Sequence, residues 1–185
     1  MAKWIFLSGL RAFPPADGIR QQLNDIVFYG EYFMKYDFTQ YVSKDSVMTL
    51  SGKNKLEVLD SMISRAADLT KLDRDTIFRL VWKREQMMTT GVGGMLALPH
   101  IRVSDILHPF VLIGVCENEI TDYQGQDDLP VRVIVFTVAP DEDQEAYLQL
   151  LSGISRRFRD SSLINELIDN VDNTVRILEL VTAEA

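Results

Sequence analysis

The stretch Val131-Arg-Val-Ile-Val-Phe-Thr-Val138 decides the fold class of this chain of 185 residues, because six of its eight residues are apolar. The stretch Phe110-Val-Leu-Ile-Gly-Val115 upstream is equally apolar. Short runs of β-branched and aromatic residues are typical of strands, and strands without a polar face are buried on both sides. The two stretches therefore predict central strands of a sheet that is covered by helices.

Helical periodicity surrounds these two strands. Two helices are expected before them, the second capped by Asp73, with apolar stripes formed by Leu56, Leu59, Met62, Ile63 and Ala66, and by Ile77, Phe78, Val81 and Trp82. An acidic run then opens a third helix whose apolar stripe includes Tyr147. Two more helices are expected around residues 161–170 and 173–181, and a short strand over residues 46–50. This alternation predicts an α/β fold with a mixed, mostly parallel β-sheet flanked by helices on both faces.

The first 33 residues differ from the rest of the chain. A turn-rich break, Phe13-Pro-Pro-Ala-Asp-Gly18, precedes one short stretch with helical spacing over residues 19–27. Residues 1–33 are interpreted as an appendage with one short helix, an oligomerisation arm or an artificial addition. Alternatively they lie upstream of a true start at Met34, since Gly30-Glu31 is a pair that a ribosome-binding sequence can encode. The domain itself is expected to span residues 34–185.

The composition excludes several classes of function. With 19 basic and 27 acidic residues, the net charge of −8 argues against nucleic acid as a partner. Cys116 is the only cysteine, so an internal disulfide is excluded, and one cysteine with two histidines makes no zinc ligand set. We expect no metal and no cofactor. No apolar run approaches the roughly 20 residues that cross a bilayer, which predicts a cytoplasmic protein without membrane insertion.

The two histidines have different settings. His108 precedes a proline at the entrance to a strand, where a structural or solvent-exposed role is expected. His100 follows Pro99 and a glycine-rich turn, which suits an imidazole that presents one nitrogen outward. Neutral imidazole is a nucleophile near pH 7 and forms covalent intermediates. Two interpretations of His100 stay open, a reactive nucleophile or a turn histidine bonded to the backbone.

The residues before His100 carry groups that bind anions. Guanidinium forks, hydroxyls and backbone N–H groups in glycine-rich turns all donate to phosphate oxygens. For the guanidinium, a surface salt bridge is the alternative. The candidate donors are the side chains of Arg84, Thr89 and Thr90 and the backbone N–H groups of Gly91, Gly93 and Gly94.

The segment Arg84-Glu-Gln-Met-Met-Thr-Thr-Gly-Val-Gly-Gly-Met-Leu-Ala-Leu-Pro-His100 resembles the active-site segment of enzyme IIA domains. The resemblance is to type 2, the fructose/mannitol type of the bacterial phosphoenolpyruvate:sugar phosphotransferase system, including its nitrogen-regulatory branch. It continues through the strand over residues 131–138, the Ala139-Pro140 break and Tyr147-Leu-Gln-Leu-Leu151, and it covers roughly residues 34–183.

This resemblance implies the type-2 enzyme IIA fold and a role for each part of the segment. His100 is implied to be the phosphoryl acceptor, through Nε2, with phospho-HPr as the donor. The phosphoryl group is then passed to an enzyme IIB or serves as a regulatory mark. The glycine turn is expected to leave room for the partner's phosphohistidine, and the family requires no metal.

Two residues depart from the family pattern. Family members commonly carry a second active-site histidine where this chain has Tyr147, and a smaller residue where it has Met95. A tyrosine donates a hydrogen bond but carries no positive charge, and it equally suits a core position. Both departures favour a regulatory variant over a high-flux transport component.

Three hypotheses for the function result. The first is a phosphoryl carrier of the nitrogen-regulatory type, in which phosphorylation of His100 changes the choice of protein partners. The second is a non-catalytic binding module with the same fold, which Tyr147 favours and the intact Pro99-His100 pair opposes. The third is a transport component that donates to a separate, sugar-specific IIB.

Overall fold

A computed structural model describes residues 37–125 and 127–183 of the chain. The expectations for residues 1–33, a short helix or a start at Met34, lie outside the described residues and stay predictions. The described chain begins with two short 3-10 helices, η2 (Phe38–Tyr41) and η3 (Lys44–Ser46). None of its helices is long and apolar enough to cross a membrane.

The centre of the fold is one six-stranded sheet. Its strands are β1 (Val47–Leu50), β2 (Gly91–Gly93), β3 (Leu96–Ala97), β4 (His100–Val103), β5 (Phe110–Gln124) and β6 (Pro130–Pro140). The order is β1-β5-β6-β3-β2, and β4 also pairs with β6. The pairs β1/β5, β3/β6 and β4/β6 are parallel, whereas β5/β6 and β2/β3 are antiparallel. The predicted mixed, mostly parallel sheet is therefore confirmed.

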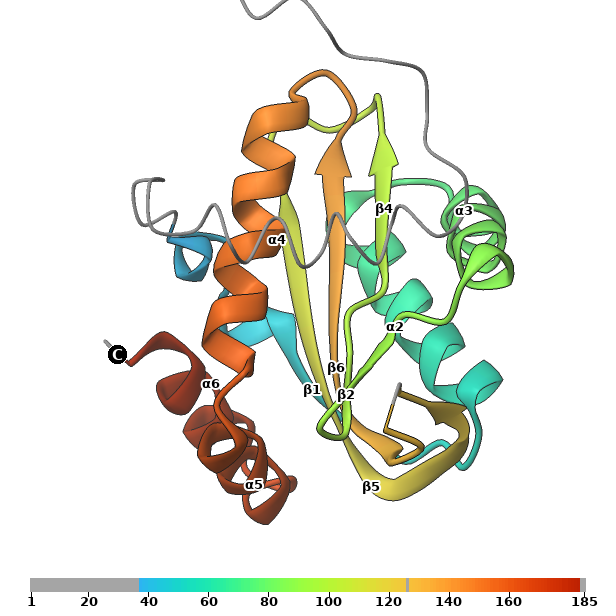
Figure 1. Cartoon of the computed structure of the whole chain (residues 1–185). Helices are drawn as coiled ribbons and strands as arrows, with labels where there is room; N and C mark the ends of the chain where they lie inside the picture. The colour runs from blue at the N-terminus through green and yellow to red at the C-terminus, as the bar shows by residue number, and fades with distance from the viewer. Residues whose placement is uncertain (1–36, 126, 184–185) are drawn as a thin grey trace, which may run out of the picture. The chain divides into compact units, whose positions relative to one another are not determined.

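Helices cover both faces of this sheet (Figure 1). On one face lie α2 (Lys55–Thr70) and α3 (Arg74–Met87), and on the other lie α4 (Gln144–Phe158), α5 (Ser161–Asp169) and α6 (Thr174–Thr182). The central strands feed both cores by alternation. Ile113 and Val135 pack on the side of α4 to α6, whereas Leu112 and Ile134 pack on the side of α2 and α3. The α/β fold with helices on both faces is confirmed.

Local signals place the helix starts correctly. Asp73 caps α3, and its carboxylate accepts a hydrogen bond from the backbone of Thr76. Asp143, in the acidic run, caps α4 in the same way. The predicted stripe of α2 is wrong at one position, because Leu56 is 52% exposed and Val58 lies in the core instead.

The sequence pattern predicts the strands only in part. β5 continues to Gln124, beyond the expected end at residue 115. The apolar pattern does not predict this extension, because residues 117–119 within it are polar and exposed. The short strands β2, β3 and β4 are unexpected, since residues 89–100 suggest only a turn. Within this stretch the residues of β2 and β3 form an antiparallel hairpin, here called the glycine hairpin (residues 91–97).

The tip of the glycine hairpin requires an unusual backbone. Gly93 and Gly94 have φ angles of 99° and 60°, and Met95 follows with a φ of 62°. Glycine adopts such angles freely, whereas for a residue with a Cβ they cost roughly 1–2 kcal/mol. The glycines are thus explained by the turn they form, and Met95 holds the turn under strain.

Candidate functional site

His100 is the first residue of β4 and lies half-buried where β4 begins to pair with β6. Its Nδ1 lies 2.8 Å from the carbonyl oxygen of Leu98, and its Nε2 lies 3.2 Å from Nε of Arg84. A carbonyl only accepts and a guanidinium only donates. The ring therefore carries its proton on Nδ1, which donates to Leu98, and keeps its lone pair on Nε2.

The electrostatic environment keeps this imidazole neutral. Burial, and secondly the positive charge of Arg84, lower the pKa of His100 to about 4, against smaller opposing effects of the Leu98 hydrogen bond and of Glu85. At neutral pH the Nε2 lone pair is consequently available as a nucleophile.

Arg84 reaches His100 from the last turn of α3. Its Nη1 donates to the carbonyl oxygen of Met88 at 2.8 Å, which fixes the side chain across the helix end while Nε points to the imidazole. The structure therefore engages Arg84 with the histidine and the backbone, in place of the surface salt bridge that was the alternative.

Tyr147 approaches His100 from the start of α4. The centroids of the two rings lie 6.2 Å apart with an interplanar angle of 59°. Tyr147 also packs, half-buried, against the core beneath α4 to α6, which agrees with a core position, and its role in the site stays a prediction. Burial raises the pKa of Tyr147 to about 12, partly opposed by Arg84 and Arg102. Its hydroxyl is thus a neutral donor at pH 7.

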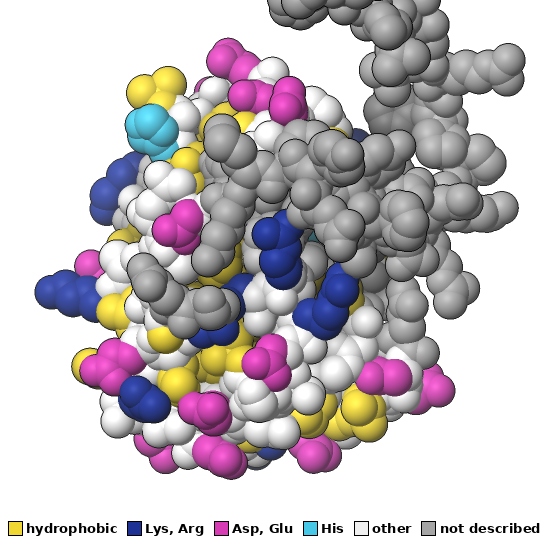
Figure 2. Space-filling view, turned by 60° about the vertical axis from the view of Figure 1, so that its left-hand side comes forward, with side chains coloured by type: hydrophobic (Ala, Val, Ile, Leu, Met, Phe, Trp, Pro, Cys, Tyr) yellow, Lys and Arg dark blue, Asp and Glu magenta, His cyan; other side chains and the backbone are white. Residues whose placement is uncertain are grey.

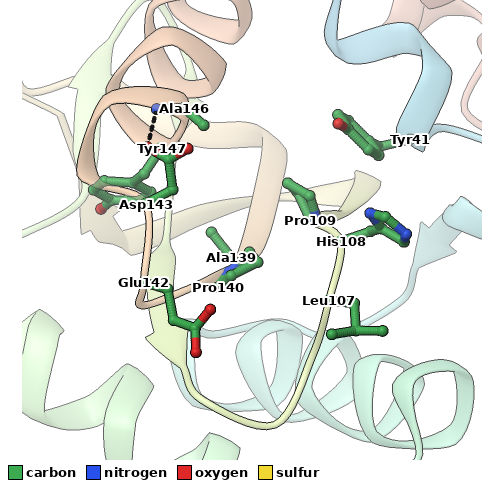
Figure 3. Close-up of a pocket in the computed structure, with 10 residues that line it drawn as sticks. All are labelled: Tyr41, Leu107, His108, Pro109, Ala139, Pro140, Glu142, Asp143, Ala146 and Tyr147. Atoms are coloured by element: carbon green, nitrogen blue, oxygen red, sulfur yellow. Dashed lines mark hydrogen bonds between the residues drawn. The ribbon is translucent and has the colours of Figure 1, made fainter.

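Tyr147 also lines a pocket of about 230 Å³. Figure 3 shows Tyr147 of α4 and Asp143, the N-cap of this helix, on one side and Tyr41 of η2 with His108 on the other. His108 is exposed in the loop before β5, as one of its two predicted roles requires. His108 therefore lines this pocket, whereas His100 is not among its lining residues.

Arg102 also belongs to the site, although the sequence pattern does not single it out. It follows His100 by two positions on β4, so the two side chains point to the same face of the strand. Its Cζ lies 5.1 Å from the centroid of the Tyr147 ring. The period of two along a strand is the signal, but it requires knowing that residues 100–103 are a strand. We call Arg84, His100, Arg102 and Tyr147 the His100 cluster.

Thr90 lies in a different environment. Its hydroxyl is buried and hydrogen-bonds to a carboxylate oxygen of Glu85 and to the hydroxyl of Tyr123. Lys55 completes this group, with its Nζ 2.7 Å from Glu85 Oε2 and above the Tyr123 ring. These four residues, which we call the Glu85 cluster, tie α2, α3, the glycine hairpin and β5 together. The structure therefore does not place the Thr90 hydroxyl beside His100.

The predicted glycine donors also lie apart from the histidine. Leu96 pairs with Val133 and His100 with Thr137, so the hairpin tip is at least four strand residues, about 13 Å, from His100 along β6. The N–H of Gly94 donates to the carboxylate of Asp127 at 2.7 Å. The glycines at the tip therefore do not surround the imidazole.

Gly91 and Thr89 contact each other at the start of the glycine hairpin. The N–H of Gly91 donates to the hydroxyl of Thr89 at 3.2 Å, and Thr89 is exposed just after α3. Gly91 itself is buried and pairs with Ala97. Of the predicted site residues, Arg84 and Tyr147 contact His100 directly.

Within residues 37–125 and 127–183, no group of three histidine, cysteine or acidic side chains is arranged to hold a metal ion. Acidic and basic side chains are interspersed over the described part of the face in Figure 2. Burial raises the pKa of the Cys116 thiol to about 12, so this thiol is protonated at neutral pH.

Comparisons with known proteins agree with this architecture. The nitrogen regulatory protein of Bradyrhizobium diazoefficiens is 27% identical over 130 residues, which are 70% of this chain and 84% of that protein. Nitrogen regulatory protein IIA-Ntr of Neisseria meningitidis superposes with a TM-score of 0.71 at 18% identity, covering 78% of this chain and 98% of that one.

A third similar structure is the complex of enzyme IIAMTL with phosphorylated enzyme IIBMTL from Escherichia coli. It superposes with a TM-score of 0.61 at 15% identity, over 77% of this chain and 98% of that one. These structures confirm the type-2 enzyme IIA fold. A family model described as phosphoenolpyruvate-dependent sugar phosphotransferase system, EIIA 2, matches residues 40–183. The chain belongs to this family of phosphotransfer components.

Proposed function

We propose that this domain is a phosphoryl carrier that accepts a phosphoryl group from phospho-HPr on Nε2 of His100 and acts in regulation. One observation carries the proposal. Nδ1 of His100 is held by the Leu98 carbonyl, which leaves the Nε2 lone pair beside the guanidinium of Arg84. A neutral imidazole with one directed lone pair next to a fixed cation suits transfer of an anionic group.

The transfer balances without a further reactant. The Nε2 lone pair attacks the phosphorus and forms the new N–P bond. The electron pair of the breaking P–N bond returns to the imidazole of the donor, which leaves as a histidine. The Nδ1 proton of His100 stays on its hydrogen bond to Leu98 throughout. The step needs no metal and no cofactor.

The neighbouring side chains supply charge and hydrogen bonds to the transferred group. Arg84 exchanges its hydrogen bond with Nε2 for one with a phosphoryl oxygen, since the ring nitrogen is occupied after transfer. Tyr147 offers a neutral hydroxyl from α4. The exposed Thr89 stays a candidate donor at the rim of the site. Phosphoryl transfer is catalysed mostly by positioning and electrostatics, which these groups provide.

Gly91, Gly93, Gly94 and Thr90 receive an indirect role in this proposal. The glycines form the hairpin that leads the chain into β4, and Thr90 anchors its first strand to Glu85. In this role they are part of the scaffold, and the exposed hairpin tip is part of the surface that a partner approaches.

A regulatory role is favoured by the similarity to nitrogen regulatory proteins. Phosphorylation adds roughly two negative charges to a site with neutral His100 and Tyr147, which changes the surface that partners meet. Donation to a separate IIB is the second candidate, because a similar IIA structure is a complex with phosphorylated IIB. Either role would place the protein in the cytoplasm, with HPr as donor and a regulatory target or a IIB as acceptor.

The test is transfer of labelled phosphate from phosphoenolpyruvate through enzyme I and HPr. The targets are wild type, His100→Ala, Tyr147→His and His108→Ala, the last being a matched control at the other histidine. We expect label on the wild type and on His108→Ala, none on His100→Ala, and faster labelling of Tyr147→His. Absence of label on wild type beside an active control IIA would favour the binding module. Label that persists in His100→Ala would identify another acceptor.

A second measurement separates regulation from transport. Labelled protein is mixed with purified IIB domains and, in parallel, unlabelled and labelled protein are compared for capture of partners of known identity. Rapid loss of label to one IIB would favour transport. Retention of label, with a partner that binds only one phosphorylation state, would favour regulation.

A further inference from the structure

Arg102 is a second arginine beside the Tyr147 ring, which also neighbours His100. It shares the face of β4 with His100, two positions away. Both residues contact the ring of Tyr147, His100 at 6.2 Å between centroids and Arg102 at 5.1 Å from its Cζ. A second guanidinium therefore lies within the His100 cluster, next to the neutral hydroxyl-bearing ring.

The hydrogen bonds of Arg102 leave one donor unused. One terminal nitrogen donates to the side-chain oxygen of Gln144 and the other to the carbonyl oxygen of Asp141, both at the start of α4. Its Nε–H is buried and has no hydrogen-bond partner among the described residues. Because buried donors are nearly always paired in folded proteins, an unpaired one in a site calls for an explanation.

We propose that Arg102 is a second phosphoryl-binding residue, whose guanidinium, with its unpaired Nε–H, binds an oxygen of the phosphoryl group on His100 while Arg84 binds another. The inference rests on the proposed carrier function. A phosphoryl group brings roughly two negative charges, and the two guanidinium groups match them. His100 and Tyr147 are neutral at pH 7. Of the four residues of the His100 cluster, the two arginines therefore carry its positive charge.

A purely structural role makes a different prediction. Arg102 also ties β4 to the start of α4 through Gln144 and Asp141, and this contact alone would explain its position. Removing Gln144 weakens the tie and keeps the charge, whereas Arg102→Gln removes the charge. The two roles therefore separate in a matched pair of variants.

The experiment measures the equilibrium constant for phosphoryl exchange between phospho-HPr and wild type, Arg102→Gln, Arg102→Lys and Gln144→Ala. Thermal unfolding midpoints of all four report on the fold. We expect Arg102→Gln to shift the equilibrium about tenfold toward phospho-HPr, since it removes a charge-assisted hydrogen bond from the phosphorylated state only. Arg102→Lys should shift the equilibrium less than Arg102→Gln, because lysine keeps the positive charge but lacks the planar guanidinium. Gln144→Ala should resemble wild type.

Each outcome decides the proposal. An unchanged equilibrium in Arg102→Gln overturns it, as does an equal shift in Gln144→Ala. If Arg102→Gln does not fold, the shift in Arg102→Lys decides in the same way, and a wild-type constant in that variant overturns the proposal. Wild type that accepts no phosphoryl group would instead refute the carrier function itself.

Discussion

Arg84 and Glu85 are neighbours on α3, yet they belong to clusters of opposite character. Arg84 points to His100, in a group that holds an available lone pair on Nε2 and an unpaired donor on Arg102. Glu85 points into the protein, where its side chain is 2% exposed and accepts from Lys55, Thr90 and Tyr123. The His100 cluster keeps one buried donor unpaired, whereas the Glu85 cluster uses its hydrogen bonds internally.

The difference between the two clusters distinguishes function from structure in polar groups. A buried network whose members satisfy one another rigidifies the fold and offers a ligand nothing. A cluster that leaves a buried donor unpaired loses stability and keeps that donor available for a ligand. Variants in the two clusters can break or sharpen this distinction.

The largest effect on stability is expected in the Glu85 cluster. Glu85→Gln leaves the charge of Lys55 without its partner in a mostly buried place, which should cost about 3 kcal/mol of unfolding free energy. Urea denaturation measures the loss. The double variant with Lys55→Met should recover part of it, because the unpaired charge is then gone. A loss below about 1 kcal/mol for Glu85→Gln would show that the Glu85 cluster is not a buried network whose members depend on one another.

A smaller effect on the unfolding free energy is expected when acid protonates His100 in the His100 cluster. The folded protein resists protonation of His100, whose pKa is about 4, whereas the unfolded chain binds that proton near pH 6.5. Stability from this group is complete above pH 6.5 and falls as the pH drops toward 4. By pH 5 the loss should be about 2 kcal/mol.

The control for this effect is His100→Gln. Unfolding free energies of wild type and variant are measured at pH 7.5 and pH 5, and the wild type should lose more. Parallel losses in the two proteins would mean that His100 titrates normally, which contradicts the neutral, nucleophilic imidazole.

The smallest effect on stability is expected at Arg84. Arg84→Gln should cost less than about 1 kcal/mol, since it removes a half-buried cation whose contacts water can replace. The same variant should raise the pKa of His100, because the positive charge of Arg84 opposes protonation. An NMR titration of His100 measures this change. Arg79→Gln, at an exposed position of the same helix, is the matched control and should leave the pKa unchanged.

Much of the fold is readable in local patterns. The apolar runs around Ile113 and Val135 predict the two central strands, and Asp73 marks a helix start, since caps and periodicity are properties of contiguous residues. The strands β2 to β4 escape prediction because each has at most four residues and the Leu98-Pro99 break interrupts them. The glycine-rich turn predicts an anion site, and the positive φ angles of Gly93 and Gly94 give these two glycines a conformational role as well.

The sequence by itself determined the fold class, the family resemblance and the histidine on which the proposed function depends. Only the tertiary structure decided which side chains surround that histidine. It brought Tyr147 and Arg102 together on one side of His100, and it drew Thr90 away to Glu85 and Tyr123. Apart from the Thr90–Glu85 pair, which is five residues apart, these contacts join residues that lie far apart in the chain. They depend on how strands and helices pack, because no local preference of a residue records which distant side chain it will meet.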